Sequence, residues 1–579
     1  MTQGGHDPMH ASTATPAPDE ESAPTPSRGR RLATGLQRQL RAPIVASAMA
    51  LLGAWAALTP SMLPRSSPLQ GVVVAVAAWA GYGLGALLGW AVRRSGGRLV
   101  GDLRRNCWRA LAGGGALGSV LMLWWYYEWE NELRDLVGMD HQGAGAIVVT
   151  LLVALVLFVL LIAISRAVKA GFAWIARGVG RFVPAPVATL IGVALTAFVG
   201  YTLLVDVATS RILSSLDAAA VAVNDEFRAD RPAPENPYVS AGPGSQVEWD
   251  KLGRQGRVFI SNRPSAEEIT RFSQRPAVEP VRAYVGIGTD GDIDLREQAV
   301  LAADELERLG GFDREVVNVV TGTGRGWVNE DQAQALEYMW NGDTATVSMQ
   351  YSYLPSPISF LVDRSRAKDA GRLLFDAVFG KWLALPEESR PKLVVSGESL
   401  GSFGGEAAFS GEQDMANRID GALFVGPTNA NELWSRFTEE RDAGSTEMAP
   451  VYGKGEIVRF AGDPTDWEAP SADWTGTRVG YLQHANDPIT WWNWSLALHR
   501  PDWLEEPTAP GVSPDMRWIP FVTMLQLGAD QMMANEVPAG QGHRFGKEPV
   551  WAWAAILPPP GWTADDTAAL AAAEPREGD

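Results

Sequence analysis

The sequence predicts an N-terminal bundle of about five membrane-spanning helices, followed by an α/β domain with a mostly parallel sheet. Three observations lead to this prediction. The first third of the chain holds successive apolar stretches, each of about 20 residues, with charged gaps between them. The last two thirds alternate short β-branched runs with amphipathic segments. One of these runs ends in a Gly-x-Ser-x-Gly turn and continues into a small-residue helical segment.

Composition excludes several classes of protein. A chain of 579 residues has room for two or three domains, and its net charge of −18 argues against binding to nucleic acid. Cys107 is the single cysteine, so no intrachain disulfide and no multi-cysteine metal site can form. The six histidines are scattered without the spacing of a metal site. We therefore expect no metal, no other cofactor and no nucleic-acid partner.

The chain divides into five segments. Residues 1–41 combine a tail rich in Pro, Ser, Thr and acidic residues, expected to be disordered, with an arginine-rich collar. Residues 42–205 form the predicted transmembrane domain, and 206–245 a linker that ends in a Pro-rich piece. The α/β domain is expected over 246–560, and a second tail over 561–579.

Five apolar segments make up the predicted transmembrane domain, at about 43–63, 70–92, 108–127, 144–164 and 184–204. A single such segment can be the buried core helix of a soluble protein. Five in succession, with charge largely confined to the gaps, favour membrane spans. The first segment follows a long tail and precedes further spans, which argues against a cleaved signal peptide.

Charges in the gaps predict the orientation of these spans. Arginine and lysine collect before the first span, after the second (residues 93–105) and after the fourth (residues 166–181), whereas the other gaps are poor in cations. The positive-inside rule therefore places the N-terminus in the cytoplasm, and five crossings place the α/β domain outside the cytoplasmic membrane. We expect a multi-pass protein of the cell membrane, with the aromatic run 124–127 at the outer boundary.

Alternating elements define the α/β domain. Strands are expected at 258–261, 281–285, 315–320, 344–352, 393–396, 422–425, 457–460 and 478–484. Helices are expected between them, at 294–309, 330–340, 362–385 and 400–410. Sheets of this type carry function at the carboxyl ends of their strands, so residues that follow strands are the candidate site.

The run Gly397-Glu398-Ser399-Leu400-Gly401 has the pattern of a nucleophile elbow. Its serine would sit on a sharp turn, and the two glycines lack the Cβ that would keep strand and helix apart. Chance occurrence in a Gly-rich chain is the alternative, but the strand before and the helix after favour the elbow. The N–H of Leu400 opens the helix and can face a developing oxyanion.

A second glycine-rich turn follows the expected strand 315–320. Gly322, Thr323 and Gly324 lie two strands ahead of the elbow, where an α/β-hydrolase has the loop that supplies the other oxyanion N–H. A flexible surface turn remains the alternative. A third turn, Gly286 to Gly291, matches the dinucleotide fingerprint G-x-G-x-x-G. Asp292 and Asp294 would oppose a pyrophosphate, so a plain turn is favoured there.

The acid and base of a serine triad follow the serine in chain order. Asp487 comes after a strand, where a triad acid belongs, although a structural aspartate at a turn is the alternative. His543 lies on a Gly-rich loop, and an exposed loop histidine is its alternative. His484 precedes the acid, and His499 follows it too closely. The order Ser399, Asp487, His543 is that of an α/β-hydrolase, with His543 as base and Asp487 holding its tautomer.

Six short motifs complete this picture. They are Leu252-Gly-Arg-Gln-Gly-Arg257, Gly322-Thr-Gly-Arg-Gly-Trp327, Tyr351-Ser-Tyr-Leu-Pro355, Gly397-Glu-Ser-Leu-Gly401, Gly426-Pro-Thr-Asn-Ala-Asn431 and His484-Ala-Asn-Asp-Pro488. Together they resemble a family of actinobacterial polytopic membrane proteins with a C-terminal α/β-hydrolase domain. The resemblance implies a serine-hydrolase fold with Ser399, Asp487 and His543 in the motif positions, and it supplies no substrate. One departure is that residues 519–535, ahead of His543, look helical where a strand is usual.

Tryptophans gather near and after the acid, at 491, 492, 494, 503, 518, 551 and 553. They are either core residues or the lining of a cleft or membrane-facing lid suited to acyl chains or sugars.

The leading interpretation is a membrane-anchored serine esterase or lipase that acts on an ester or acyl-lipid substrate through an acyl-enzyme. One alternative is an acyltransferase acting on envelope lipids or glycans. The other is a non-catalytic membrane scaffold or transport-associated protein with a hydrolase fold. Reactivity of Ser399 separates the catalytic interpretations from the scaffold.

Overall fold

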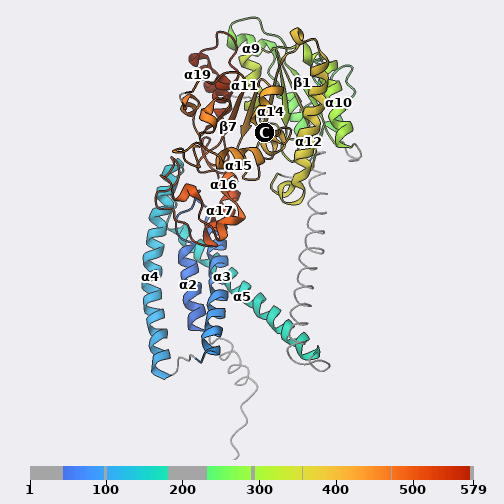
Figure 1. Ribbon diagram of the computed structural model, residues 1–579. Helices are drawn as coiled ribbons and strands as arrows, with labels where there is room; N and C mark the ends of the chain where they lie inside the picture. The colour runs from blue at the N-terminus through green and yellow to red at the C-terminus, as the bar shows by residue number, and fades with distance from the viewer. Residues whose placement is uncertain are drawn as a thin grey trace, which may run out of the picture.

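The computed structural model describes residues 43–96, 101–179, 224, 231–287, 294–354, 356–470 and 472–573. Long N-terminal helices stand beneath an α/β domain, and one end of each of α2, α3, α4 and α5 meets the base of that domain (Figure 1).

One parallel sheet of seven strands forms the centre of the domain, in the order β1-β3-β2-β4-β5-β7-β6. The strands are β1 (Val281–Val285), β2 (Val316–Thr321), β3 (Thr344–Met349), β4 (Lys392–Glu398), β5 (Gly421–Val425), β6 (Val458–Ala461) and β7 (Arg478–Leu482). Most of their residues are buried, as parallel strands are when helices cover both faces. The predicted parallel sheet is confirmed, and β4 lies between β2 and β5.

Helices on each face build two apolar clusters. On one face lie α10 (Leu295–Arg308), α12 (Ser356–Ala384) and α13 (Leu400–Glu406). On the other lie α11 (Glu330–Met339) and α18 (Glu548–Ile556). Shorter helices complete the domain: α8 (Gly253–Ser261), α9 (Ala266–Ser273), α14 (Glu412–Arg418), α15 (Glu432–Glu439), α16 (Pro488–Trp491), α17 (Val522–Asp530) and α19 (Ala564–Ala572).

Three expectations for this domain were wrong. Residues 258–261 are helical within α8, because a short apolar run fits a buried helix as well as a strand. β7 ends at Leu482, so His484 lies beyond the strand. The expected tail 561–579 contains α19, whose buried Leu570 packs with α18, so the domain extends beyond residue 560.

The linker also ends earlier than expected. Val239 is buried and bridges to Arg282 of β1, so its end belongs to the domain. The tail 1–41, the segment 184–204 and residues 288–293 of the third glycine turn lie outside the described residues.

The N-terminal helices are α2 (Ile44–Ala56), α3 (Ser67–Arg94), α4 (Gly101–Leu136) and α5 (Gly145–Val179). Of these, α3 and α5 are long and apolar enough to cross a membrane. Four of the five expected spans fall on the described residues, so the expectation is corrected to two candidate spans there. With 13 residues, α2 is short. The uncharged middle of α4, residues 110–127, is rich in Gly, Trp and Tyr and is therefore less apolar.

The loop between α2 and α3 is fastened to the α/β domain by a buried carboxylate. Asp530, at the end of α17, pairs with Arg65 at 2.5 Å, and it accepts hydrogen bonds from the hydroxyl of Ser61 at 2.5 Å and the N–H of Met62 at 3.1 Å. Met62 and Leu63 are part of the main core of the domain. The N-terminal helices and the domain therefore share one packed interior.

Candidate active site

Ser399 occupies a sharp turn between β4 and α13. Its φ of 54° and ψ of −119° are strained for a residue with a side chain. A Cβ on Gly397 would lie 2.4 Å from the carbonyl oxygen of Gly401, and one on Gly401 would lie 2.2 Å from the carbonyl oxygen of Thr321. Both glycines are therefore required sterically. The N–H of Ser399 donates to the carbonyl of Val425 at 2.8 Å, which fixes the turn against the end of β5.

Asp487 and His543 form a buried pair. Nδ1 of His543 lies 2.6 Å from Oδ2 of Asp487, and the other carboxylate oxygen accepts from the N–H of Ile489 at 2.9 Å. Asp487 thus caps α16 and orients the imidazole at once. Among the described residues Nε2 of His543 is buried and has no hydrogen-bond partner. When the neutral ring carries its proton on Nδ1, which is hydrogen-bonded to Asp487, Nε2 is the basic nitrogen and can accept a proton.

Gly426 lies against the imidazole of His543. It follows Val425, the residue to which Ser399 is hydrogen-bonded, and has a φ of +54°. A Cβ there would lie 2.5 Å from Cε1 of His543. The histidine ring therefore lies against Gly426, directly after the strand end to which Ser399 is hydrogen-bonded, and the three predicted triad residues share the carboxyl edge of the sheet.

The pKa of His543 is shifted by two opposed effects. Burial lowers it, but the charge of Asp487 and its hydrogen bond outweigh burial, and the net pKa is raised above the usual value. Glu398 adds to this rise. Burial in turn raises the pKa of Glu398, although His543 and the hydrogen bond donated by the side chain of Asn329 oppose that rise.

A second histidine holds the His543 loop. His484 is buried, with Nδ1 2.7 Å from the carbonyl oxygen of Gly542 and Nε2 2.7 Å from Oε2 of Glu548. The side-chain oxygen of Asn486 accepts from the N–H of Gly542 at 2.9 Å. The motif that contains Asp487 thus also holds the loop that contains His543. Residues 519–542, directly ahead of His543, are described and contain no strand.

The glycine loop after β2 lies beside the elbow. Thr321 pairs with Gly397 across the sheet, and the carbonyl of Gly322 is 3.3 Å from the Cβ position on Gly401. The N–H of Thr323 already donates to the carbonyl of Trp327 at 2.9 Å. The N–H of Leu400, at the start of α13, has no intrahelical acceptor by its position.

Three contributors to the site were not singled out from the sequence. Glu398 is part of the elbow pentapeptide itself, but nothing in the pattern indicates that its charge acts on the pKa of His543. Gly426 belongs to a motif noted only for its resemblance, and a glycine directly after a strand was its available signal. Asn329 begins α11 as a helix cap, a signal for helix boundaries and not for catalysis.

Among the described residues, no group of three or more His, Cys, Asp or Glu side chains could hold a metal ion.

Comparison with known proteins gives two matches. Residues 281–570, just over half of the chain, match the family model described as "Alpha/beta-hydrolase family". Residues 58–264 match the model described as "Alpha/beta-hydrolase family N-terminus". No curated protein and no solved structure was found to match the chain.

Proposed function

Because the chain belongs to the alpha/beta-hydrolase family, we propose that it is a serine hydrolase that cleaves an ester through a covalent acyl-enzyme at Ser399. One observation carries this proposal. The imidazole of His543 is held by Asp487 at 2.6 Å, with an unpartnered Nε2, on the same sheet edge as the strained serine. A buried basic nitrogen beside a serine on a sharp turn is the arrangement that activates such a nucleophile.

In the proposed reaction Nε2 of His543 takes the hydroxyl proton as Oγ of Ser399 attacks the ester carbonyl. The leaving alcohol receives that proton, and the acyl group stays on Ser399. Water then attacks the acyl-enzyme, gives its proton to His543, and releases the carboxylic acid. Asp487 keeps the imidazole in the required tautomer throughout.

The oxyanion would accept hydrogen bonds from the N–H of Leu400 and from one N–H of the glycine loop. Because the N–H of Thr323 is engaged with Trp327, Gly322 and Gly324 are the preferred donors in that loop. Donors fixed in advance stabilise charge in the transition state without reorganisation.

We further propose that the protein is anchored in the cell membrane through several spans, with the N-terminus in the cytoplasm and the α/β domain outside. The apolar side chains of α5 support this, since only 11% of its most apolar stretch is buried, unlike a core helix of a soluble protein. Large apolar residues are also exposed along α3 and α4.

Ester hydrolysis by the purified full chain tests this function. We expect release of 4-methylumbelliferone from its butyrate ester by the wild type and by Ser389→Ala. Ser389 is exposed and precedes β4, whereas Ser399 follows the other end of that strand. Ser399→Ala should release none. Turnover that survives in Ser399→Ala would refute the assignment. Acylated alcohols formed in place of free acid would identify the alternative reaction, acyl transfer through the same acyl-enzyme.

A further inference from the structure

The base of the α/β domain is built on the N-terminal helices. α17 packs against α3, and its Val522 and Leu525 join the apolar cluster that contains Ala57 and Val73. The side-chain amide of Gln526 donates to the carbonyl of Thr59 at 2.8 Å. α17 therefore lies level with the ends of α2 and α3 that face the domain (Figure 1). For helices that cross a membrane, this level is the interface between hydrocarbon and water.

Four large apolar side chains are exposed at this base. Trp494 is 73% exposed, Leu498 64%, Phe521 58% and Met532 71%. Two contacts join the segments that carry them: the N–H of Phe521 donates to the carbonyl of Ala497 at 3.0 Å, and the indole of Trp492 donates to the carbonyl of Met524 at 2.9 Å. We call these four residues the base patch. By contrast Trp491, Trp503 and Trp553 are buried core residues.

We propose that the base patch inserts into the interfacial layer of the lipid bilayer and that the substrate is an acyl ester drawn from that bilayer. The patch continues the lipid-facing surface of the helices. Trp124 and Trp125 of α4 are exposed at the same end of the molecule, and the neighbouring indole of Trp129 donates to Asp515 of the domain at 3.1 Å. An aromatic and apolar surface at this level matches a membrane interface.

The patch is joined covalently and by packing to the catalytic acid. Asp487 caps α16, and the chain runs from the end of α16 through Trp492 to Trp494. The rings of Trp492 and Trp494 pack edge to face at 5.0 Å between centroids. Asp487 therefore belongs to the same short chain segment as Trp494, which we place in the lipid interface. This step rests on the proposed serine hydrolase activity, whereas the contact of the patch with lipid does not.

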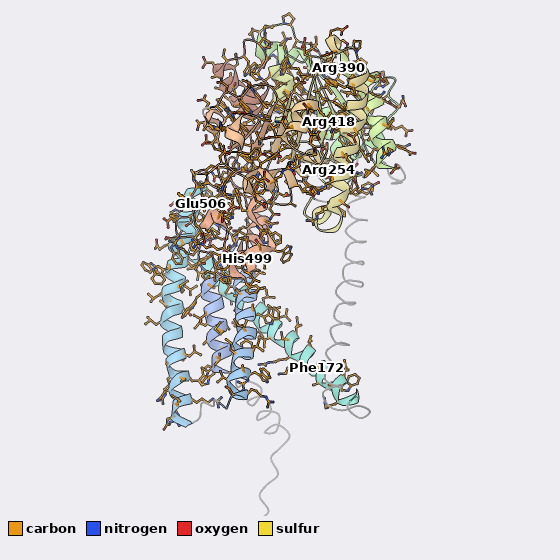
Figure 2. All side chains as sticks on the ribbon, viewed as in Figure 1. Phe172, Arg254, Arg390, Arg418, His499 and Glu506 are labelled. Atoms are coloured by element: carbon orange, nitrogen blue, oxygen red, sulfur yellow. The ribbon has the colours of Figure 1, made fainter. Side chains whose placement is uncertain are left out.

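Figure 2 labels two residues that set the design of the test: His499, beside Leu498, at the base of the domain, and Arg390 at the opposite end. In a Cys107→Ser background, single cysteines at Trp494, Met532 and Ser389 carry bimane, and the full chain is reconstituted in phosphatidylcholine vesicles with doxyl-labelled lipid. We expect quenching at 494 and 532 and little at the control position 389. Equal quenching at all three positions would overturn the membrane contact.

The substrate class is tested with one variant and one matched control. Trp494→Gln/Leu498→Gln should lower hydrolysis of 4-methylumbelliferyl palmitate in vesicles about tenfold and leave soluble butyrate hydrolysis unchanged, since two interfacial side chains are lost. Leu383→Gln, at an exposed leucine remote from the base, should change neither rate. Equal rates on palmitate for variant and wild type would refute the bilayer substrate. A wild type that hydrolyses neither ester and resists a fluorophosphonate would refute the serine hydrolase itself, and quenching would then decide the membrane contact alone.

Discussion

The carboxylate of Asp487 lies 2.6 Å from Nδ1 of His543, although 56 residues separate them in the chain. His484 and Asn486 maintain this relationship by holding the carbonyl and the N–H of Gly542, the residue before the histidine. The acid, the loop clamp and the start of α16 all belong to one motif. Local sequence thus arranges a contact between two residues that are far apart in the chain.

Asp487→Asn should lower the rate of ester hydrolysis by about 10⁴-fold, because an amide favours the wrong tautomer of His543. Asparagine still caps a helix, so α16 should persist and the circular dichroism spectrum should be unchanged. Steady-state kinetics on the butyrate ester measure the loss. A decrease of less than about tenfold would exclude Asp487 as the triad acid.

The pH dependence of kcat/KM should report His543. Because the net pKa of His543 is raised above 6.5, activity should rise with pH through a midpoint above 6.5. The sign for stability is opposite: a raised folded-state pKa stabilises the fold below the unfolded value, and this contribution is lost as pH rises through the folded-state pKa. Asp487→Asn should shift the residual midpoint downward. A wild-type midpoint below 6.5 would contradict the pairing.

Gly426→Ala should displace the imidazole, since the new methyl group would lie 2.5 Å from Cε1 of His543. A displacement of the imidazole by about 1 Å lowers kcat/KM by about 100-fold. Gly444→Ala is the matched control, because Gly444 also has a positive φ but no heavy atom within 4 Å of its Cβ position. The control should share the backbone strain and keep its activity. Equal activities in the two variants would show that Gly426 does not position His543.

Asp530→Ala should destabilise the whole chain, because Arg65 would stay buried without its partner. Loss of one member of a buried pair costs roughly 3–5 kcal/mol. Arg271→Ala breaks an exposed i,i+4 pair with Glu267 and should cost only about 0.5 kcal/mol. Thermal unfolding in detergent, followed by tryptophan fluorescence, compares the two. Similar Tm values would mean that the α2–α3 loop is not held by Asp530.

The seven strands of the sheet could be predicted because they are buried apolar runs that end at turn signals. The elbow could also be predicted. Gly397 and Gly401 lack the Cβ that would clash with the neighbouring backbone, and both glycines are visible in the pentapeptide. Helix α8 could not be predicted, because the apolar run Val258–Ile260 is too short to show whether its period is that of a strand or of a buried helix.

Contacts between segments that are far apart in the chain could not be predicted from the sequence. Nothing local indicates that Arg65 of the α2–α3 loop pairs with Asp530, or that the charge of Glu398 acts on the pKa of His543. The membrane prediction depended on apolar length alone. Glycines and aromatic residues lower the hydropathy of α4, and α2 is short. The described part of the chain therefore contains two candidate spans where four were expected.

Labelling of the purified full chain with a fluorophosphonate probe tests the central claim most directly, because the probe reacts only with an activated serine. We predict that the wild type is labelled, that Ser399→Ala and His543→Ala are not, and that Ser389→Ala is labelled like the wild type. Failure of the folded wild type to react, or labelling that persists in Ser399→Ala, would contradict the account.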